Sequence, residues 1–250
     1  MPRWLKLTAS ALFGGLLLGT PARSLHAYTL PAVILMADAH AKKTEQARLE
    51  KAIAADPKNC TLRFELGAVL CDLAADGEEA AADSALKVFE NLRKELPKDP
   101  EVMAFYGNAC TIEAKYSFVL TKLSWVHDGF HYLDDAVKSA PDDVNVHIIR
   151  AMNSAQVPGY LGREDTARED FAWIMQRKEA RPQDFSPDLL RTIYYFAGKF
   201  ALEHDQPEAV SLFMQAAAIP AGKDDAFSLK IQNYLKTARA KFPAAGDKTS

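Results

Sequence analysis

The amino-acid sequence predicts an all-helical protein built from helix pairs that repeat along the chain. Prolines that follow helical segments recur at intervals of 43, 41, 41 and 38 residues, and these are Pro57, Pro100, Pro141, Pro182 and Pro220. Proline cannot continue a helix, and the aspartates beside three of these prolines favour turns and helix starts. The apolar residues between the prolines follow a helical period, whereas the alternation typical of a strand is scarce.

A second pattern recurs inside each unit. The first helix carries a small residue, in the dipeptides Leu66-Gly67, Tyr106-Gly107, Arg150-Ala151 and Phe196-Ala197. The second helix carries a small residue with partners at i+4 and i+7, in the sets Ala85/Phe89/Leu92, Gly129/Leu133/Ala136, Ala167/Phe171/Ile174 and Ala209/Phe213/Ala216. A small residue lets two helices approach closely, and a large one fills the gap beside it. The pattern therefore indicates a repeated helix-turn-helix unit.

The expected helices follow the chain in order. The first spans residues 31–55 and ends at the Asp56-Pro57 turn. Four pairs follow, with helices at residues 60–74 and 80–95, 101–116 and 120–139, 144–156 and 164–179, and 187–203 and 207–218. A last helix near residues 224–241 caps the stack with one apolar face, made of Phe227, Ile231, Tyr234, Leu235 and Ala238.

The repeats resemble the tetratricopeptide-repeat (TPR) family over about residues 45–240. The last unit is the most similar, because its small and large residues have the family's spacing and Pro220 closes the unit; these residues are Phe196, Ala197, Phe200, Ala209, Phe213 and Ala216. The earlier units contain extra residues, such as the turn at residues 76–79. The resemblance implies a TPR-like solenoid of about four irregular helix pairs with flanking helices, over residues 28–242, followed by a disordered tail at residues 243–250.

The N-terminus is typical of a secretory signal. Arg3 and Lys6 precede an apolar stretch at residues 7–18, and cleavage is plausible after Ala22 or Ala27. We therefore expect a signal peptide at residues 1–27, a periplasmic or secreted protein and no stable membrane anchor. The alternative is an uncleaved anchor or a buried first helix. A narrower resemblance, to exported bacterial TPR-like proteins of unknown role, rests on stretches such as residues 122–124, 133–137 and 150–154 and implies fold and compartment only.

Charge and cysteine content bound the function further. The formal net charge is −3, so the chain has no basic field and a nucleic-acid partner is not expected. An odd number of cysteines leaves at least one without an internal partner. Cys71 and Cys110 pair only if their helices are neighbours; the preferred alternative is that these two and Cys60 serve as small buried apolar residues.

The resemblance also implies a binding groove. In TPR proteins one face of each first helix lines the groove, and this face is matched here by residues that include Phe64, Asn108, Asn145, Met152, Arg191 and Tyr194. Arg150 stands where the repeat usually carries a large apolar residue, and Asn153 follows one turn later. Together these two could hold an acidic group of a partner, although an internal ion pair of Arg150 with Asp170 or with an aspartate of residues 134–143 is the favoured alternative.

Two further segments are weaker candidates for functional sites. The irregular connection at residues 157–163 is either the rim of a binding site or a tight linker. His127 and His131 are one helical turn apart, which makes them weak candidates for a metal site, but the zinc-hydrolase motif is missing.

The sequence contains no recognised catalytic or phosphate-binding motif, so we expect neither an enzyme nor a cofactor. The main hypothesis is a scaffold that presents a concave groove to a protein or peptide partner or to a small ligand. One alternative is an oligomeric accessory subunit similar to the T-component of periplasmic TRAP transporters, and a second is a metal-dependent activity at His127 and His131.

Overall fold

The computed structural model describes residues 39–220 and 225–243, and within these ranges every regular element is helical. The α-helices are α2 (Ala39–Ala55), α3 (Cys60–Ala75), α4 (Glu79–Glu95), α5 (Pro100–Tyr116), α6 (Val119–Ser139), α7 (Val144–Gln156), α8 (Glu164–Ala180), α9 (Pro187–Glu203), α10 (Ala209–Ala218) and α11 (Asp225–Lys241). Two short 3-10 helices, η1 (Gly159–Leu161) and η2 (Pro182–Asp184), lie in the connections.

The predicted helix pairs are confirmed. They are α3 with α4, α5 with α6, α7 with α8 and α9 with α10, and each pair is packed together. The first expected helix, at residues 31–55, corresponds to α2 from Ala39 onward. Its expected residues 31–38 lie outside the described residues. The predicted signal peptide and residues 244–250 of the predicted tail also lie outside them.

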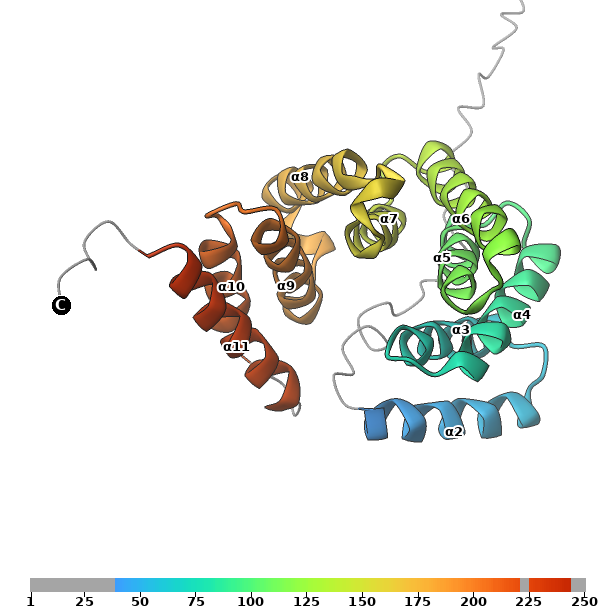
Figure 1. Ribbon diagram of the computed structural model, residues 1–250. Helices are drawn as coiled ribbons and strands as arrows, with labels where there is room; N and C mark the ends of the chain where they lie inside the picture. Colours follow the sequence, from blue (N-terminus) through green and yellow to red (C-terminus); the bar gives the residue numbers. More distant parts are fainter. Residues whose placement is uncertain (1–38, 221–224, 244–250) are drawn as a thin grey trace, which may run out of the picture.

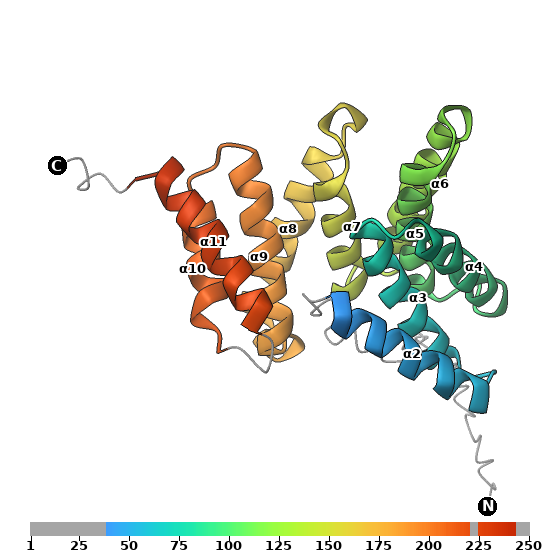
Figure 2. The same ribbon diagram turned by 60° about the horizontal axis from the view of Figure 1, so that its bottom comes forward.

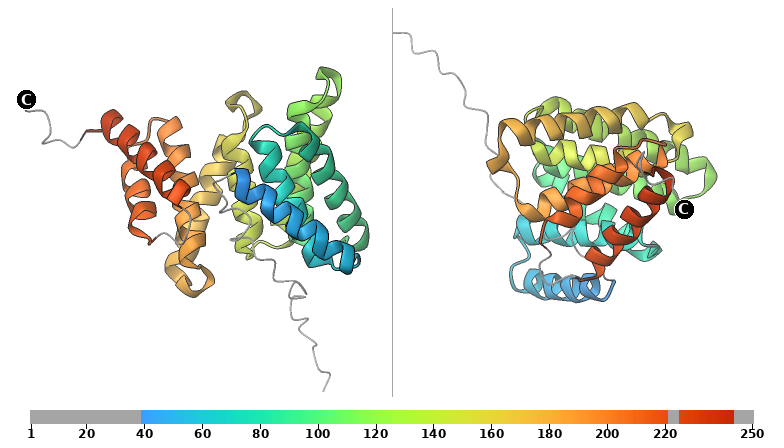
Figure 3. Two further views of the ribbon diagram at one scale, coloured as in Figure 1. Left: turned by 90° about the horizontal axis from the view of Figure 1, so that it is seen from below. Right: turned by 90° about the vertical axis from the view of Figure 1, so that its left-hand side faces the viewer.

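The helix pairs stack side by side into an arc (Figure 1). The first helices of the pairs, α3, α5, α7 and α9, form the inner side, while α4, α6, α8 and α10 form the outer side. Helix α2 packs on α3 at one end, and α11 packs on α10 and α9 at the other (Figure 3). Each pair therefore contacts mainly its neighbours, as in a solenoid.

Side chains at the turns set where the inner helices start. Asp99 precedes α5 and its carboxylate accepts hydrogen bonds from the backbone N–H groups of Glu101 and Val102. Asp143 caps α7 in the same way, with the N–H of Asn145 as donor. Proline is the first residue of both α5 and α9, where its missing N–H costs no helical hydrogen bond. Two of the three acidic turns of the sequence thus supply helix N-caps, whereas at the first turn Asn59 caps α3 and donates to Asp56.

The small residues of the repeat pattern lie where the two helices of a pair approach each other. A Cβ atom added to Gly107 on α5 would lie only 2.7 Å from the backbone oxygen of Gly129 on α6. A Cβ atom on Gly67 or Gly198 would lie 2.7 or 2.9 Å from the ring of Phe89 or Phe213, respectively. The large residue of one helix therefore fills the space above the glycine of the other.

The apolar core is a chain of three clusters. The first extends from α2 to α7 and contains the ring cluster of Phe64, Phe89 and Phe105. The second joins α7, α8 and α9, and the third joins α9, α10 and α11. Because α7 and α9 each contribute to two clusters, they connect neighbouring parts of the arc.

The contact between α5 and α6 generates the first prediction. Gly107→Ala is expected to destabilise the protein by about 1–3 kcal/mol, because the added methyl group meets backbone that cannot move aside, although alanine favours a helix over glycine by about 1 kcal/mol. Chemical denaturation measures the change. The control is Gly159→Ala, whose Cβ would meet only the flexible carboxylate end of Glu164. Equal stability of the two variants would contradict the close-approach account.

Candidate functional site

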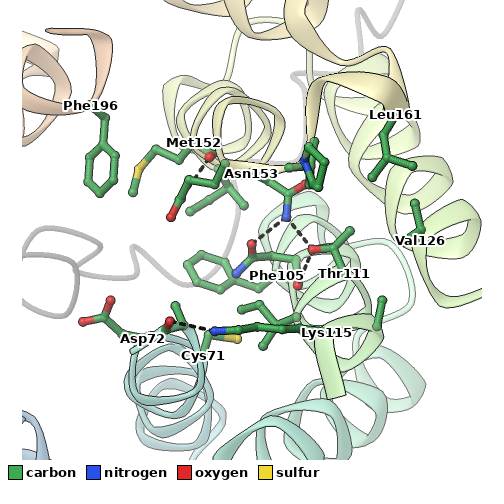
Figure 4. A pocket seen from close by; sticks show the side chains of 18 of the residues that line it. Cys71, Asp72, Phe105, Thr111, Lys115, Val126, Met152, Asn153, Leu161 and Phe196 are labelled. Carbon is green, nitrogen blue, oxygen red and sulfur yellow. Dashed lines mark hydrogen bonds between the residues drawn. The ribbon is translucent and has the colours of Figure 1, made fainter. Parts of the chain in front are cut away.

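A cavity of about 510 Å³ lies on the inner side of the arc (Figure 4). Helices α3, α5 and α7 contribute most of its lining, and α6, α9 and the connection after α7 complete it. Its larger apolar lining residues are Phe105, Ile112, Val126, Ile149, Met152, Leu161 and Phe196. Its polar lining residues include Asp72, Asn108, Thr111, Lys115, Lys122, Asn153 and Gln156. An apolar wall with a few polar groups is typical of a ligand site.

A network of amide and hydroxyl groups joins α5 to α7 in the wall of this cavity. The Asn153 side chain is buried, and its Nδ2 donates to Asn108 Oδ1 at 2.9 Å and to Thr111 Oγ1 at 2.5 Å (Figure 4). The Thr111 hydroxyl in turn donates to the backbone oxygen of Asn108 at 2.8 Å. Asn153 Oδ1 has no hydrogen-bond partner among the described residues. The network holds the inner helices of two successive pairs in a defined register.

Charged groups border the α3 side of the cavity. Asp72 forms an ion pair with Lys42 of α2 at 2.7 Å. Burial raises the pKa of the Asp72 carboxyl to about 6, although Lys42 opposes the shift. Burial also raises the pKa of the neighbouring Cys71 thiol, so this thiol stays protonated at neutral pH and is a poor nucleophile. All three cysteines are free; Cys71 and Cys110 are buried, and Cys60 is half-buried.

Three residues of the predicted groove face line the cavity, and these are Asn108, Met152 and Asn153. The segment 157–163 contributes Val157, Pro158, Tyr160 and Leu161 and so forms part of the rim. Sequence reasoning missed the lining from Phe105, Thr111, Lys115 and the first half of α6. The one available signal was the proximity of Thr111 to Asn108, which lies one helical turn earlier on the same face.

Other residues of the predicted groove face lie elsewhere. Phe64 is buried in the aromatic cluster of α3, α4 and α5. Tyr194 is buried in the cluster that α9 forms with α10 and α11. Arg191 is buried too; its guanidinium donates to Ser228 of α11 at 2.6 Å and lies over the Phe227 ring. These three residues stabilise the ends of the arc and are not part of the cavity lining.

Arg150 forms the internal ion pair that was favoured from the sequence. Its Nε and one terminal nitrogen donate to the two carboxylate oxygens of Asp170, both at 2.8 Å. Asp170 also lies 2.7 Å from His147 Nδ1. Asp134 accepts hydrogen bonds from two arginines. A terminal nitrogen of Arg150 donates to Asp134 Oδ1 at 3.2 Å, and the two terminal nitrogens of Arg163 donate to Asp134 Oδ2 and Oδ1 at 2.9 and 2.7 Å. The network ties α6, α7 and α8 together and anchors the irregular segment 157–163.

This network generates the second prediction. Asp170 is 1% exposed at its side chain, so Asp170→Ala leaves Arg150 and His147 without their buried acceptor. We expect a loss of stability of about 3–5 kcal/mol in chemical denaturation. The matched control is Asp165→Ala on the same helix, because the Asp165 side chain is 87% exposed and its ion pair is with the exposed Arg168. The control should cost less than about 1 kcal/mol. A small effect at both positions would show that the network does not stabilise the fold.

Asn145, another predicted groove residue, contacts a buried carboxyl group instead of the cavity. Its Nδ2 donates to Glu101 Oε1 at 3.0 Å. Glu101 is buried on α5, and burial raises the pKa of its carboxyl to about 8, with Asp143 and Asp99 adding to the shift. Glu101 is therefore largely protonated at neutral pH.

The raised pKa generates the third prediction. The folded protein binds the proton of Glu101 more tightly than the unfolded chain, whose pKa is near 4.5, so stability decreases as pH rises from about 4.5 to about 8. Glu101→Gln mimics the protonated form. Its stability relative to the parent chain should therefore increase across this window by about 1.4 kcal/mol per unit of pKa shift. Urea denaturation at several pH values measures both curves, and parallel curves would refute the assignment.

His127 and His131 lie on α6 and are both exposed, each near an aspartate, at 3.5 Å from Asp128 and 3.3 Å from Asp135, respectively. In residues 39–220 and 225–243, no group of three or more His, Cys, Asp or Glu side chains is placed to hold a metal ion.

None of the helices described is both long and apolar enough to cross a membrane.

Comparison with solved structures identifies the architecture. A thermophilic TPR protein from Thermus thermophilus superimposes with a TM-score of 0.59 and 16% sequence identity, over 78% of this chain and 91% of that one. The chain has a TPR-like fold. No model of a known protein family matches it, and a search of the curated proteins finds no match either. At this identity the likeness extends to the TPR-like fold and not to a ligand or an activity.

Proposed function

We propose that this TPR-like protein is a non-catalytic scaffold that binds a short segment of a partner polypeptide in the cavity on its inner face. The observation that carries the proposal is the cavity itself, where Phe105, Met152 and Phe196 supply apolar surface beside the amides of Asn108 and Asn153. A TPR-like fold favours protein interaction, and the sequence features at residues 1–27 favour a periplasmic or secreted location.

The size and chemistry of the cavity favour a peptide over a folded domain. A volume of about 510 Å³ lies within the range of about 300–1,000 Å³ that suits drug-sized ligands, so it accommodates a few side chains. The apolar residues suit aliphatic or aromatic side chains of the ligand, and the amide of Gln156 can pair with its main chain. The lining also contains Asp72, Lys115 and Lys122. A charged group of the ligand, of either sign, can therefore lie near a residue of opposite charge.

Site-specific photo-crosslinking tests this proposal. A photoreactive phenylalanine analogue replaces Met152, which lines the cavity, or Met214, which is exposed on α10 and is not among the lining residues. After irradiation of cells that make the protein, mass spectrometry should find one dominant polypeptide attached at position 152 and none at position 214. An untagged competitor chain should reduce the adduct, and a competitor with Met152→Glu should not.

Two outcomes would contradict the proposal. Equal adducts at positions 152 and 214 would mean that the cavity is not the binding site. A stable trimer that carries a small molecule, without any cross-linked polypeptide, would favour the transport-accessory hypothesis.

A further inference from the structure

Two separate turns of the molecule expose large apolar side chains to an unusual degree. The first comprises Phe118 in the turn between α5 and α6 and Val119, Leu120 and Leu123 at the start of α6, and the second, at η1, carries Tyr160. These five side chains are 67 to 91% exposed and make up most of the large apolar residues that are exposed in the described ranges. We name them the apolar tips. Soluble proteins rarely gather such groups on one side without an interaction that covers them.

The two apolar tips project from the same side of the arc. In Figures 2 and 3 the turn before α6 and the connection after α7 extend from one edge of the molecule. The cavity lining includes Lys122 and Val126 next to the first tip and Tyr160 and Leu161 at the second. The tips therefore stand on one edge of the arc, about 40 residues apart in sequence, where a single flat surface can contact both.

The charges around the first tip favour an anionic surface, whereas Glu164 and Asp165 follow the second tip. Residues 114–127 contain no aspartate or glutamate, whereas Lys115 and Lys122 flank the first tip. In the other two turns within helix pairs, Asp76 pairs with Lys42 and Asp205 pairs with Lys241. The edge with the apolar tips thus combines exposed apolar groups with an excess of positive charge in its first tip.

From this geometry we infer that the apolar tips insert into the surface of an anionic lipid bilayer, so that the protein binds membranes peripherally. Tyr160 is amphipathic and suits the level of the lipid head groups, Phe118 and the aliphatic side chains enter the acyl boundary, and the lysines contact anionic head groups. A deformable lipid surface accepts two protruding tips at once. The side chains of both tips are largely exposed in the described part of the chain, so a partner has to cover each of them. A rigid protein partner would need two separate matching pockets to do so.

Vesicle sedimentation tests this inference. The purified chain is mixed with vesicles of phosphatidylcholine alone, or with vesicles in which roughly a third of the lipid is phosphatidylglycerol. Stronger sedimentation with the anionic vesicles is expected, and the double variant Phe118→Ser/Leu120→Ser should reduce it by about tenfold or more. The matched control is Met214→Ser/Leu229→Ser, which removes two other exposed apolar side chains and should bind as the parent chain does. Since all variants share one N-terminus, their differences report on the tips alone.

A second variant separates charge from apolar insertion. Lys122→Glu should remove most of the preference for anionic vesicles while retaining the helical circular dichroism spectrum. The inference is overturned if the parent chain does not sediment with either vesicle, or if the control loses binding as much as the tip variant does. It is also overturned if the tip variant only converts an oligomer to a monomer in analytical ultracentrifugation, because the tips would then join two copies of the chain. None of these outcomes depends on whether the cavity binds a peptide.

Discussion

The close approach of the two helices in each pair is the constraint on which the rest of the structure depends. Gly107 and Gly129 allow backbone to lie against backbone between α5 and α6, and Phe89 and Phe213 fill the space over Gly67 and Gly198 in their pairs. A pair held this tightly packs on the next one as a unit, so the stack turns in one direction and acquires an inner face. The cavity exists because of this curvature, since residues from α3 to α9 border it.

Much of the fold could be predicted because its signals are local and repeat along the chain. Proline cannot continue a helix, and a polar side chain caps the start of each of the inner helices α3, α5, α7 and α9, so the starts of these helices follow from single residues. The site could be predicted only in its middle part. Asn108, Met152 and Asn153 lie on central helices, where the inner face borders the cavity. Arg191 and Tyr194 occupy the equivalent face near one end, but α11 packs over them, and the sequence pattern of a single repeat does not reveal which neighbour covers it.

Polar residues inside the arc lie in two distinct surroundings that the residue types alone do not reveal. Arg150 is used internally, because Asp170 and Asp134 arrive from α8 and α6 to neutralise it. Asn153, one turn later on α7, faces α5 and belongs to the cavity wall. The surroundings change within a single turn of helix, so only the positions of the neighbouring helices distinguish a group in an internal ion pair from a group in the cavity wall.

The division of the core into three connected clusters has a mechanical consequence. None of the three clusters contains residues of both α3 and α9, so the separation of these two helices is set through α7 and the contacts between successive pairs. A ligand that touches both Asp72 and Phe196 fixes the width of the arc and thereby stiffens every pair between them. In the binding proposed above, part of the entropy cost would therefore come from ordering helices that never contact the ligand.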